Sequence, residues 1–292
     1  MSSKFRELWR KFRWWTIYQG PRRDVTIPTW NGLLTVDSKD WLIGKYLYVR
    51  RQYEAHEIKN AIGLLRKEGY LEKPGRGTVI DVGANLGMIS IALLKNGEFD
   101  SALAFEPAPN SYRLLVQNIN QNGLGNRIQS FPIALSSGDC EMELEFSDDN
   151  SGDNRLRATT ASGRFGEEKR RTLNVPVRTL DGLFSDDVGL HDGDVAMVWL
   201  DIQGHEGHFL EGARRVLSRG VPVVTGFWPY AVMRSGMSQA EFCARVSEIF
   251  THFYVVSDRE SEKRSVWELH AMFEAYSRPR QMCVVALVRD GA

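Results

Sequence analysis

Residues 78–87 are the stretch that most constrains how this chain folds. The first half of the stretch is apolar and β-branched and carries an acid, Asp81, whereas the second half is small and flexible. An apolar pattern with helical spacing follows, so the order predicts a strand, a tight turn and a helix. Gly83 and Gly87 allow the backbone to turn sharply, and the free N–H groups at the helix start attract a negative group. A nucleotide-like ligand is therefore expected at this turn.

The spacing of the small residues narrows the choice of ligand. A dinucleotide fingerprint needs two more glycines after Gly83, but those positions hold Asn85 and Met88, which disfavours a nicotinamide dehydrogenase. No Gly-Lys-Ser/Thr closes the turn, so it is not a P-loop. A second acid, Glu106, ends the apolar run at residues 102–105, where a carboxylate can bind the two ribose hydroxyls. A glycine-rich turn together with an acid at the end of the second strand, but without a diphosphate-binding motif, favours S-adenosylmethionine as the ligand.

Composition and charge argue against a nucleic-acid-binding, a secreted and a membrane-spanning protein. Lys plus Arg and Asp plus Glu number 37 each among the 292 residues, so the formal net charge is zero and no overall field attracts nucleic acid. Only a basic patch at residues 164–171 keeps nucleic-acid methylation open. The three cysteines, Cys140, Cys243 and Cys283, lack pair spacing and are expected to be reduced thiols in a cytoplasmic protein. No apolar run approaches the roughly 20 residues needed to cross a bilayer, and the N-terminus lacks an apolar signal core.

The first predicted helix, residues 4–15, is amphipathic and basic. Its apolar residues recur at helical spacing, and its arginines lie on another face. The apolar residues are Phe5, Leu8, Trp9, Phe12 and Trp15, and the arginines are Arg6, Arg10 and Arg13. Docking of the apolar face on the domain is the favoured prediction, because globular proteins use amphipathic helices in this way far more often than membranes do. Peripheral contact with the inner face of the membrane is the alternative.

The N-terminal part is predicted to form a cap. It contains two short β-like runs, residues 33–36 and 46–49, and a helical pattern at residues 53–67. Proline and glycine break this pattern at residues 74–77. We therefore divide the chain into a cap of residues 1–76 and a ligand-binding domain of residues 77–292.

Downstream of the turn, strands and helices alternate. Strands are expected at residues 102–106, 128–135, 173–179, 195–201, 221–225, 253–256 and 282–288, and helices at residues 110–122 and 239–250 and in a segment ending at Leu217. Alternation of this kind predicts an α/β fold with parallel strands, right-handed crossovers and a ligand at the carboxyl ends of the strands. Asp81, Glu106 and Asp201 all fall at such ends.

The alternation is interrupted at residues 147–171, a polar stretch rich in charged residues. A solvated loop is the favoured interpretation of this stretch. Because it is longer than a compact connection needs, a lid that covers the substrate is the alternative.

Several motifs taken in order resemble the FkbM-type methyltransferases. They lie at residues 80–87, 105–107, 118–123, 134–136, 179–181 and 201–206, within a segment of about residues 78 to 228. The resemblance implies a class I methyltransferase fold, which is Rossmann-like, with a seven-stranded sheet that is mostly parallel and has an antiparallel last strand. It also implies S-adenosylmethionine as cofactor and O-methylation of a hydroxyl on a sugar-containing or secondary-metabolite acceptor. A small-molecule or glycan acceptor is accordingly the expected partner.

The resemblance and the position in the fold indicate which residues bind the cofactor. We expect Asp81, Gly83, Ala84 and Asn85 to hold the methionine part, Glu106 the ribose and Ala134 the adenine, with Pro107 and Asp201 completing the set.

The loop after the strand at residues 195–201 carries the candidate catalytic residues. His205 is the candidate general base because its reference pKa of about 6.5 is near working pH, and Asp201 or Glu206 would orient it. The alternative is a structural hydrogen bond, the commoner role of a lone histidine at a helix start. No metal is expected, because neighbours on one loop do not form a coordination shell.

Two positions depart from the family pattern. Trp199 stands where members often have Lys, and Gly226 stands where they often have Glu. The rival hypothesis is therefore a cofactor-binding module of the same fold without turnover. The acceptor pocket is expected to include Tyr53, Glu54 and His56, unless these residues only cap a helix.

Overall fold

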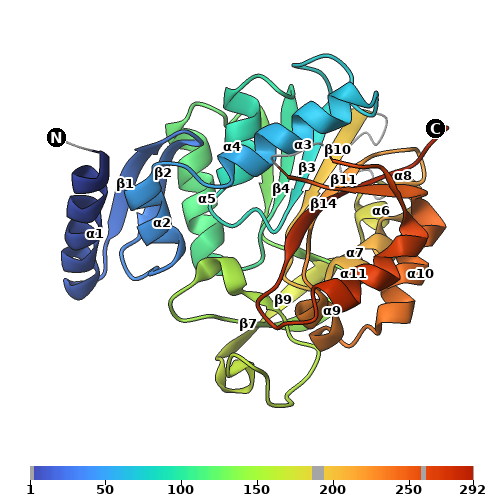
Figure 1. Cartoon of the computed structure of the whole chain (residues 1–292). Helices are drawn as coiled ribbons and strands as arrows, with labels where there is room; N and C mark the ends of the chain where they lie inside the picture. Colours follow the sequence, from blue (N-terminus) through green and yellow to red (C-terminus); the bar gives the residue numbers. More distant parts are fainter. Residues whose placement is uncertain (1–2, 186–193, 258–260, 292) are drawn as a thin grey trace.

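The structure is a computed structural model that describes residues 3–185, 194–257 and 261–291. Its centre is a sheet of eight strands in the order β13-β12-β14-β11-β10-β3-β4-β5 (Figure 1). The strands are β3 (Thr78–Val82), β4 (Ser101–Phe105), β5 (Ile128–Phe131), β10 (Val195–Leu200), β11 (Val223–Phe227), β12 (His252–Val255), β13 (Arg264–Ser265) and β14 (Cys283–Val288).

The directions of the strands confirm the predicted sheet. Strands β11, β10, β3, β4 and β5 are parallel, whereas the last strand, β14, lies antiparallel between β11 and β12. A two-residue strand, β13, extends the predicted seven strands at one edge. The mostly parallel α/β fold expected from the alternation of apolar segments is therefore present.

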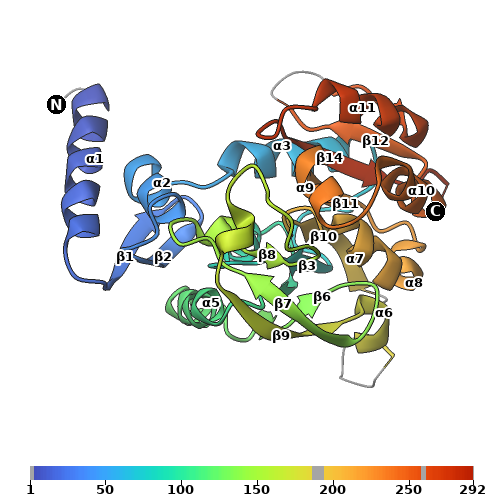
Figure 2. The same cartoon turned by 90° about the horizontal axis from the view of Figure 1, so that it is seen from below.

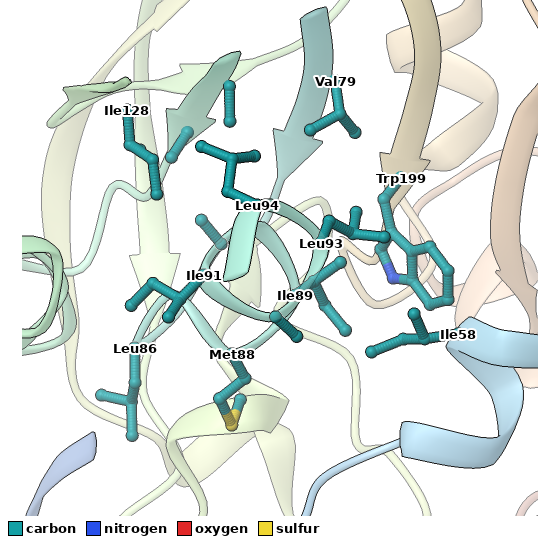
Figure 3. Packing of buried hydrophobic residues seen from close by; sticks show 14 of the residues in the cluster. Ile58, Val79, Leu86, Met88, Ile89, Ile91, Leu93, Leu94, Ile128 and Trp199 are labelled. Atoms are coloured by element: carbon teal, nitrogen blue, oxygen red, sulfur yellow. The ribbon is translucent and has the colours of Figure 1, made fainter. Parts of the chain in front are cut away.

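Helices cover both faces of the sheet because its central strands are apolar on both faces. Along β10, Met197 and Trp199 belong to one buried cluster, and Val198 and Leu200 belong to the other. The first cluster is completed by α3 (Ala55–Lys67), α4 (Met88–Lys95) and α5 (Pro109–Gln121). The second is completed by α6 (Leu180–Leu183), α7 (Glu206–Gly212), α8 (Arg214–Leu217), α9 (Pro229–Arg234), α10 (Gln239–Ile249) and α11 (Leu269–Ala275). Figure 3 shows Trp199 beside Ile58 of α3 in the first cluster.

The N-terminal part contains α1 (Ser3–Gln19), a hairpin of β1 (Asp24–Thr29) and β2 (Gly32–Asp37), and α2 (Ile43–Arg50). The predicted strand at residues 46–49 is wrong, because these residues lie in α2. A short apolar run does not reveal its period, and here its buried residues face α1, where Tyr48 contacts the Trp14 ring with a centroid separation of 5.4 Å. Gly44 permits this approach, since a Cβ there would lie 2.6 Å from Trp14.

Buried side chains join the hairpin to α5. The Asn118 Oδ1 accepts the Thr35 N–H at 2.7 Å, and its Nδ2 donates to the Leu86 carbonyl at 2.9 Å. One buried amide therefore connects the hairpin with the turn that precedes α4.

Helix α1 lies at the outer edge of the molecule, beyond α2 and the hairpin (Figures 1 and 2). The favoured prediction that its apolar face docks on the domain is wrong. The helix packs on α2 through Trp14, which is fully buried, while the side chains of the predicted apolar face are exposed. Among the described residues, no helix combines the length and apolar character needed to cross a membrane.

A second, smaller sheet is formed by the segment that follows β5. It consists of β6 (Ala134–Leu135), β7 (Cys140–Glu145), β8 (Arg155–Leu156) and β9 (Thr172–Arg178) in the order β6-β9-β7-β8. The strand predicted at residues 128–135 is therefore divided between β5 in the main sheet and β6 in this one.

The polar stretch at residues 147–171 is folded rather than solvated. Buried ion pairs hold it in place, with the Arg155 guanidinium 3.7 Å from Glu145 and 4.0 Å from Glu167. The Arg234 guanidinium, on α9, lies 3.4 Å from the same Glu167 carboxylate. The favoured interpretation as a solvated loop is wrong for Arg155 and Glu167, which are buried, whereas Asp148 and Asp149 of the same stretch are exposed.

Candidate functional site

A pocket lies at the carboxyl ends of β3, β4 and β10, where the parallel sheet was expected to bind its ligand. The ends of these strands contribute Asp81, Glu106 and Asp201 to its wall. The start of α3 and the stretch at residues 147–171 form the opposite side. The pocket is lined by every residue of the predicted cofactor set: Asp81, Gly83, Ala84, Asn85, Glu106, Pro107, Ala134 and Asp201.

The turn after β3 has the tight geometry that its sequence predicts. Gly83 and Gly87 have φ of 84° and 81°, and Asn85 between them has φ of 48°. A Cβ at Gly83 would collide with the carbonyl oxygen of Asp201. Only glycine therefore lets the turn lie directly against the end of β10.

The two acids nearest this turn are buried and accept backbone hydrogen bonds. Glu106 accepts the N–H of Asn85 and the N–H of Ala108, each at 2.8 Å, and Asp81 accepts the N–H of Ser90 at 3.0 Å. Burial nevertheless raises the pKa of each carboxyl group to about 7. The two acids therefore fix the turn, and burial makes their negative charge costly.

Two further acids, Glu54 and Asp201, line the same pocket. Burial raises the pKa of Asp201 to about 6, and burial together with repulsion from Asp201 raises the pKa of Glu54 to about 8. Asp201 accepts a hydrogen bond from the Gln203 amide at 2.5 Å. Glu54 and Tyr53 line the pocket as predicted, whereas His56 is exposed outside it.

Backbone strain is concentrated at this pocket. Of the four non-glycine residues with positive φ in the described part of the chain, three line it, namely Glu54, Asn85 and Gln203. Such conformations cost free energy and persist where the surrounding structure fixes them, commonly at functional sites. Each of three segments that form the pocket therefore contains one such residue: the start of α3, the glycine-rich turn and the loop after β10.

The structure gives His205 and Glu206 different surroundings. His205 lines the pocket, but its Nε2 lies 2.7 Å from the Ser136 hydroxyl, and burial beside His208 lowers its pKa to about 3. Glu206 is buried behind the loop, where it accepts the N–H groups of Ile202 and Gly204 at 3.2 Å each. Burial raises the pKa of Glu206 to about 7. Glu206 shapes the loop, and His205 is neutral at physiological pH.

The polar stretch contributes pocket residues that no pattern in the sequence predicted. They are Ser151, Asn154, Arg155 and Leu156, and a lid that covers the substrate stays a prediction for this stretch. Alternation of Arg155 and Leu156 spans too few residues to have revealed a strand.

Trp228 and Tyr230 contact the polar stretch at residues 147–171. The Trp228 indole donates to the Pro279 carbonyl at 2.6 Å, and the Tyr230 hydroxyl donates to Glu167 at 2.7 Å. The Arg155 guanidinium lies 5.1 Å from the centre of the Trp228 ring.

Among residues 3–185, 194–257 and 261–291, no group of three or more His, Cys, Asp or Glu side chains is arranged to hold a metal ion.

Comparisons with known proteins identify the family to which the chain is similar. A methyltransferase, sdnD of Sordaria araneosa, is 28% identical over 105 residues, which are 36% of this chain and 38% of that relative. Methyltransferase FkbM from Methylobacillus flagellatus KT superposes with a TM-score of 0.43 and 15% identity, over 82% of this chain and 56% of that chain. The M. jannaschii TYW2 structure in complex with AdoMet superposes with a TM-score of 0.45 and 12% identity, over 92% and 87% of the respective chains. The family model for the methyltransferase FkbM domain matches residues 81–255, more than half of the chain, and the chain therefore belongs to the FkbM methyltransferase family.

Proposed function

We propose that this FkbM-family protein transfers a methyl group from S-adenosylmethionine to a hydroxyl on a sugar-containing or secondary-metabolite acceptor. The observation that carries the proposal is the set of carboxyl groups in one pocket, from Glu54, Asp81, Glu106 and Asp201. Burial is the largest cause of the raised pKa of each of them. A ligand with positive charge relieves that cost, whereas the pyrophosphate of a dinucleotide adds negative charge.

One buried polar atom in the pocket also has a free hydrogen-bonding capacity that the cofactor could use. The Asn85 Oδ1 is buried and accepts no hydrogen bond in the described part of the chain. Asn85 and Asp81 would hold the methionine end, Glu106 the ribose hydroxyls, and Ala134 the adenine. When bound, S-adenosylmethionine supplies an electrophilic methyl group. The turn and the strand ends align the acceptor with it, and alignment supplies much of the rate in such displacements.

Methylation of an alcohol also requires removal of a proton, and we assign this role to the Glu54 and Asp201 pair. Two neighbouring carboxyl groups titrate as a unit, and repulsion makes one of them a stronger base than an isolated carboxylate. With S-adenosylmethionine bound, the hydroxyl proton would pass to one carboxylate of this pair as the acceptor oxygen takes the methyl group, whose bond to the sulfonium sulfur breaks to leave S-adenosylhomocysteine. His205 is less suited, because its pKa of about 3 makes it a weak base and its Nε2 is engaged by Ser136.

The acceptor side of the pocket supports a hydroxyl-bearing substrate. Tyr53, Ser151 and Asn154 supply hydrogen-bonding groups there, and Trp199 supplies an apolar wall. A site that combines a few polar groups with an aromatic surface suits a sugar or a glycosylated metabolite.

One observation favours the rival, a cofactor-binding module without turnover. A Cβ at Gly226 would lie 3.9 Å from the Asp201 Oδ1, so this position points toward Asp201 but carries no side chain. The chain lacks the acid that relatives often place there, and Glu54 is the acid that lines the same pocket together with Asp201.

Two measurements test the proposal. Calorimetry should give binding of S-adenosylhomocysteine and S-adenosylmethionine, with no comparable binding of NADH. A methyl-release assay on a panel of glycans and glycosylated metabolites should then identify an acceptor. Binding without turnover on any acceptor favours the rival module, and tight NADH binding instead of S-adenosylmethionine overturns the cofactor assignment.

A further inference from the structure

The outer face of α1 is a continuous apolar surface. The surface is formed by side chains three or four residues apart along the helix, each between 48% and 64% exposed: Phe5, Leu8, Trp9, Phe12 and Trp15. The rings of Phe12 and Trp15 stack with their centroids 6.2 Å apart. Large contiguous apolar surfaces of this kind mark interaction sites in soluble proteins.

The opposite face of α1 is the one that holds the helix in place. Trp14 is fully buried against α2, and the Arg10 guanidinium donates to the Val49 carbonyl at 3.1 Å. The helix is therefore fixed with its apolar side turned away from the rest of the chain. Figures 1 and 2 show the same arrangement, with α1 at the edge of the molecule in both views.

Positive charge borders the apolar surface on both sides. On a helical projection, Arg6 and Arg13 flank one edge and Lys4 and Lys11 flank the other. Residues 3–23 carry seven Lys and Arg side chains against one acid, Glu7, in a chain whose net charge is zero. Glu7 is itself neutralised by Lys11 at 2.8 Å and Arg50 at 3.1 Å.

We propose that α1 binds the surface of an anionic lipid bilayer, with its apolar side chains among the acyl chains and its basic side chains among the headgroups. Tryptophan and arginine suit this boundary, because the indole ring is apolar with one polar atom and the arginine stem is apolar with a charged end. The helix lies in the plane of the surface, since its charged residues prevent it from spanning the bilayer. The anchor holds the pocket close to that membrane.

A second copy of the chain is the other partner that an apolar face can accept. Pairing two α1 faces would bring the basic borders of both copies together, and their mutual repulsion opposes such a dimer. Anionic headgroups neutralise the same charges, so the charge pattern favours the lipid surface.

Flotation of the full chain with vesicles tests this proposal. We expect binding to vesicles of phosphatidylcholine with about 30% phosphatidylglycerol, and at least roughly tenfold weaker partitioning onto phosphatidylcholine alone, because each basic residue near the surface contributes to the affinity. Binding should weaken as salt is raised, since the headgroup charges are screened. Equal binding to both vesicles, or binding to neither, overturns the proposal.

Variants at exposed positions separate the anchor from the fold. Leu8→Ser combined with Phe12→Ser should reduce partitioning at least roughly tenfold, because buried apolar area drives insertion. Trp267→Ser, which removes an apolar side chain that is 73% exposed elsewhere, should leave it unchanged. Arg6→Gln with Arg13→Gln should reduce the preference for anionic vesicles, because Lys4 and Lys11 remain on the other border, whereas Lys73→Gln with Arg76→Gln should preserve it in full. A dimer in the absence of vesicles that disappears with the Leu8 and Phe12 changes identifies a second copy as the partner and overturns the lipid assignment.

Discussion

The Glu106 Oε2 accepts the backbone N–H of Asn85 at 2.8 Å, so the acid at the end of β4 also fixes the turn at the end of β3. Its other oxygen accepts the Ala108 N–H at the start of α5. The carboxylate that is expected to bind the ribose is therefore part of the frame that shapes the rest of the pocket. Binding and local stability are coupled at this residue.

This coupling predicts the effect of changing Glu106. Glu106→Ala should weaken binding of S-adenosylhomocysteine at least tenfold, because hydrogen bonds to a charged group are worth about 1.5–3 kcal/mol each. The variant should also unfold at a lower temperature, since two buried N–H groups lose their acceptor. Calorimetric titration and thermal unfolding measure the two effects. An unchanged dissociation constant would show that the ribose does not bind at Glu106.

The raised pKa values predict that cofactor binding depends on pH. Asp81 and Glu106 have pKa values of about 7, and a sulfonium favours their charged forms, so binding releases protons. Affinity for S-adenosylmethionine should therefore rise as pH increases through about 7, by up to about tenfold per pH unit for each proton released. S-adenosylhomocysteine, whose sulfur is neutral, is the matched control and should show a smaller rise. Identical pH profiles for the two compounds would contradict a role for carboxylate charge at the sulfur.

The same shifts predict how one substitution affects stability. The pKa of Asp81 in the folded protein is raised to about 7, above its value in the unfolded chain, so its favourable contribution is present at low pH and is lost as pH rises through about 7. Asp81→Asn keeps an oxygen for the Ser90 N–H and cannot acquire charge. The unliganded variant should be more stable than the native protein at pH 8 by on the order of 2 kcal/mol, with a smaller difference at pH 6. Denaturant unfolding at the two pH values measures this, and a variant that is less stable at pH 8 would contradict it.

Local patterns were sufficient to predict the parallel strands of the sheet and the residues that line one wall of the pocket, whereas the antiparallel last strand was expected only from the family resemblance. The strand, turn and helix around Gly83 depend on residues next to each other in the chain, and the acid after β4 follows from the same local rule. Parallel strands bring their carboxyl ends to one edge, which explains why Asp81, Glu106 and Asp201 meet as expected.

The other parts of the site depend on contacts between distant segments. The Arg155 guanidinium donates to Asp153 and lies within ion-pair distance of Glu145 and Glu167. No spacing in the sequence indicates that Arg155 and these two glutamates become buried together. The predicted orientation of α1 was wrong for a similar reason. Its periodicity identifies an apolar face, but the packing of Trp14 against α2 decides which face is covered.

The assignment of the base predicts a difference between Glu54 and His205. Glu54→Gln should lower kcat by about 10²- to 10⁴-fold, the usual contribution of a general base, and should leave affinity for S-adenosylhomocysteine within about twofold, because it lies on the acceptor side. The pH at which activity rises should also shift, since the pair of carboxyl groups no longer titrates together. His205→Ala, the matched control in the same pocket, should change kcat much less, because a pKa of about 3 makes the ring a weak base and its Nε2 is hydrogen-bonded to Ser136. These rates can be measured once an acceptor is found. A large loss of kcat in His205→Ala with little loss in Glu54→Gln would assign the base to the histidine instead.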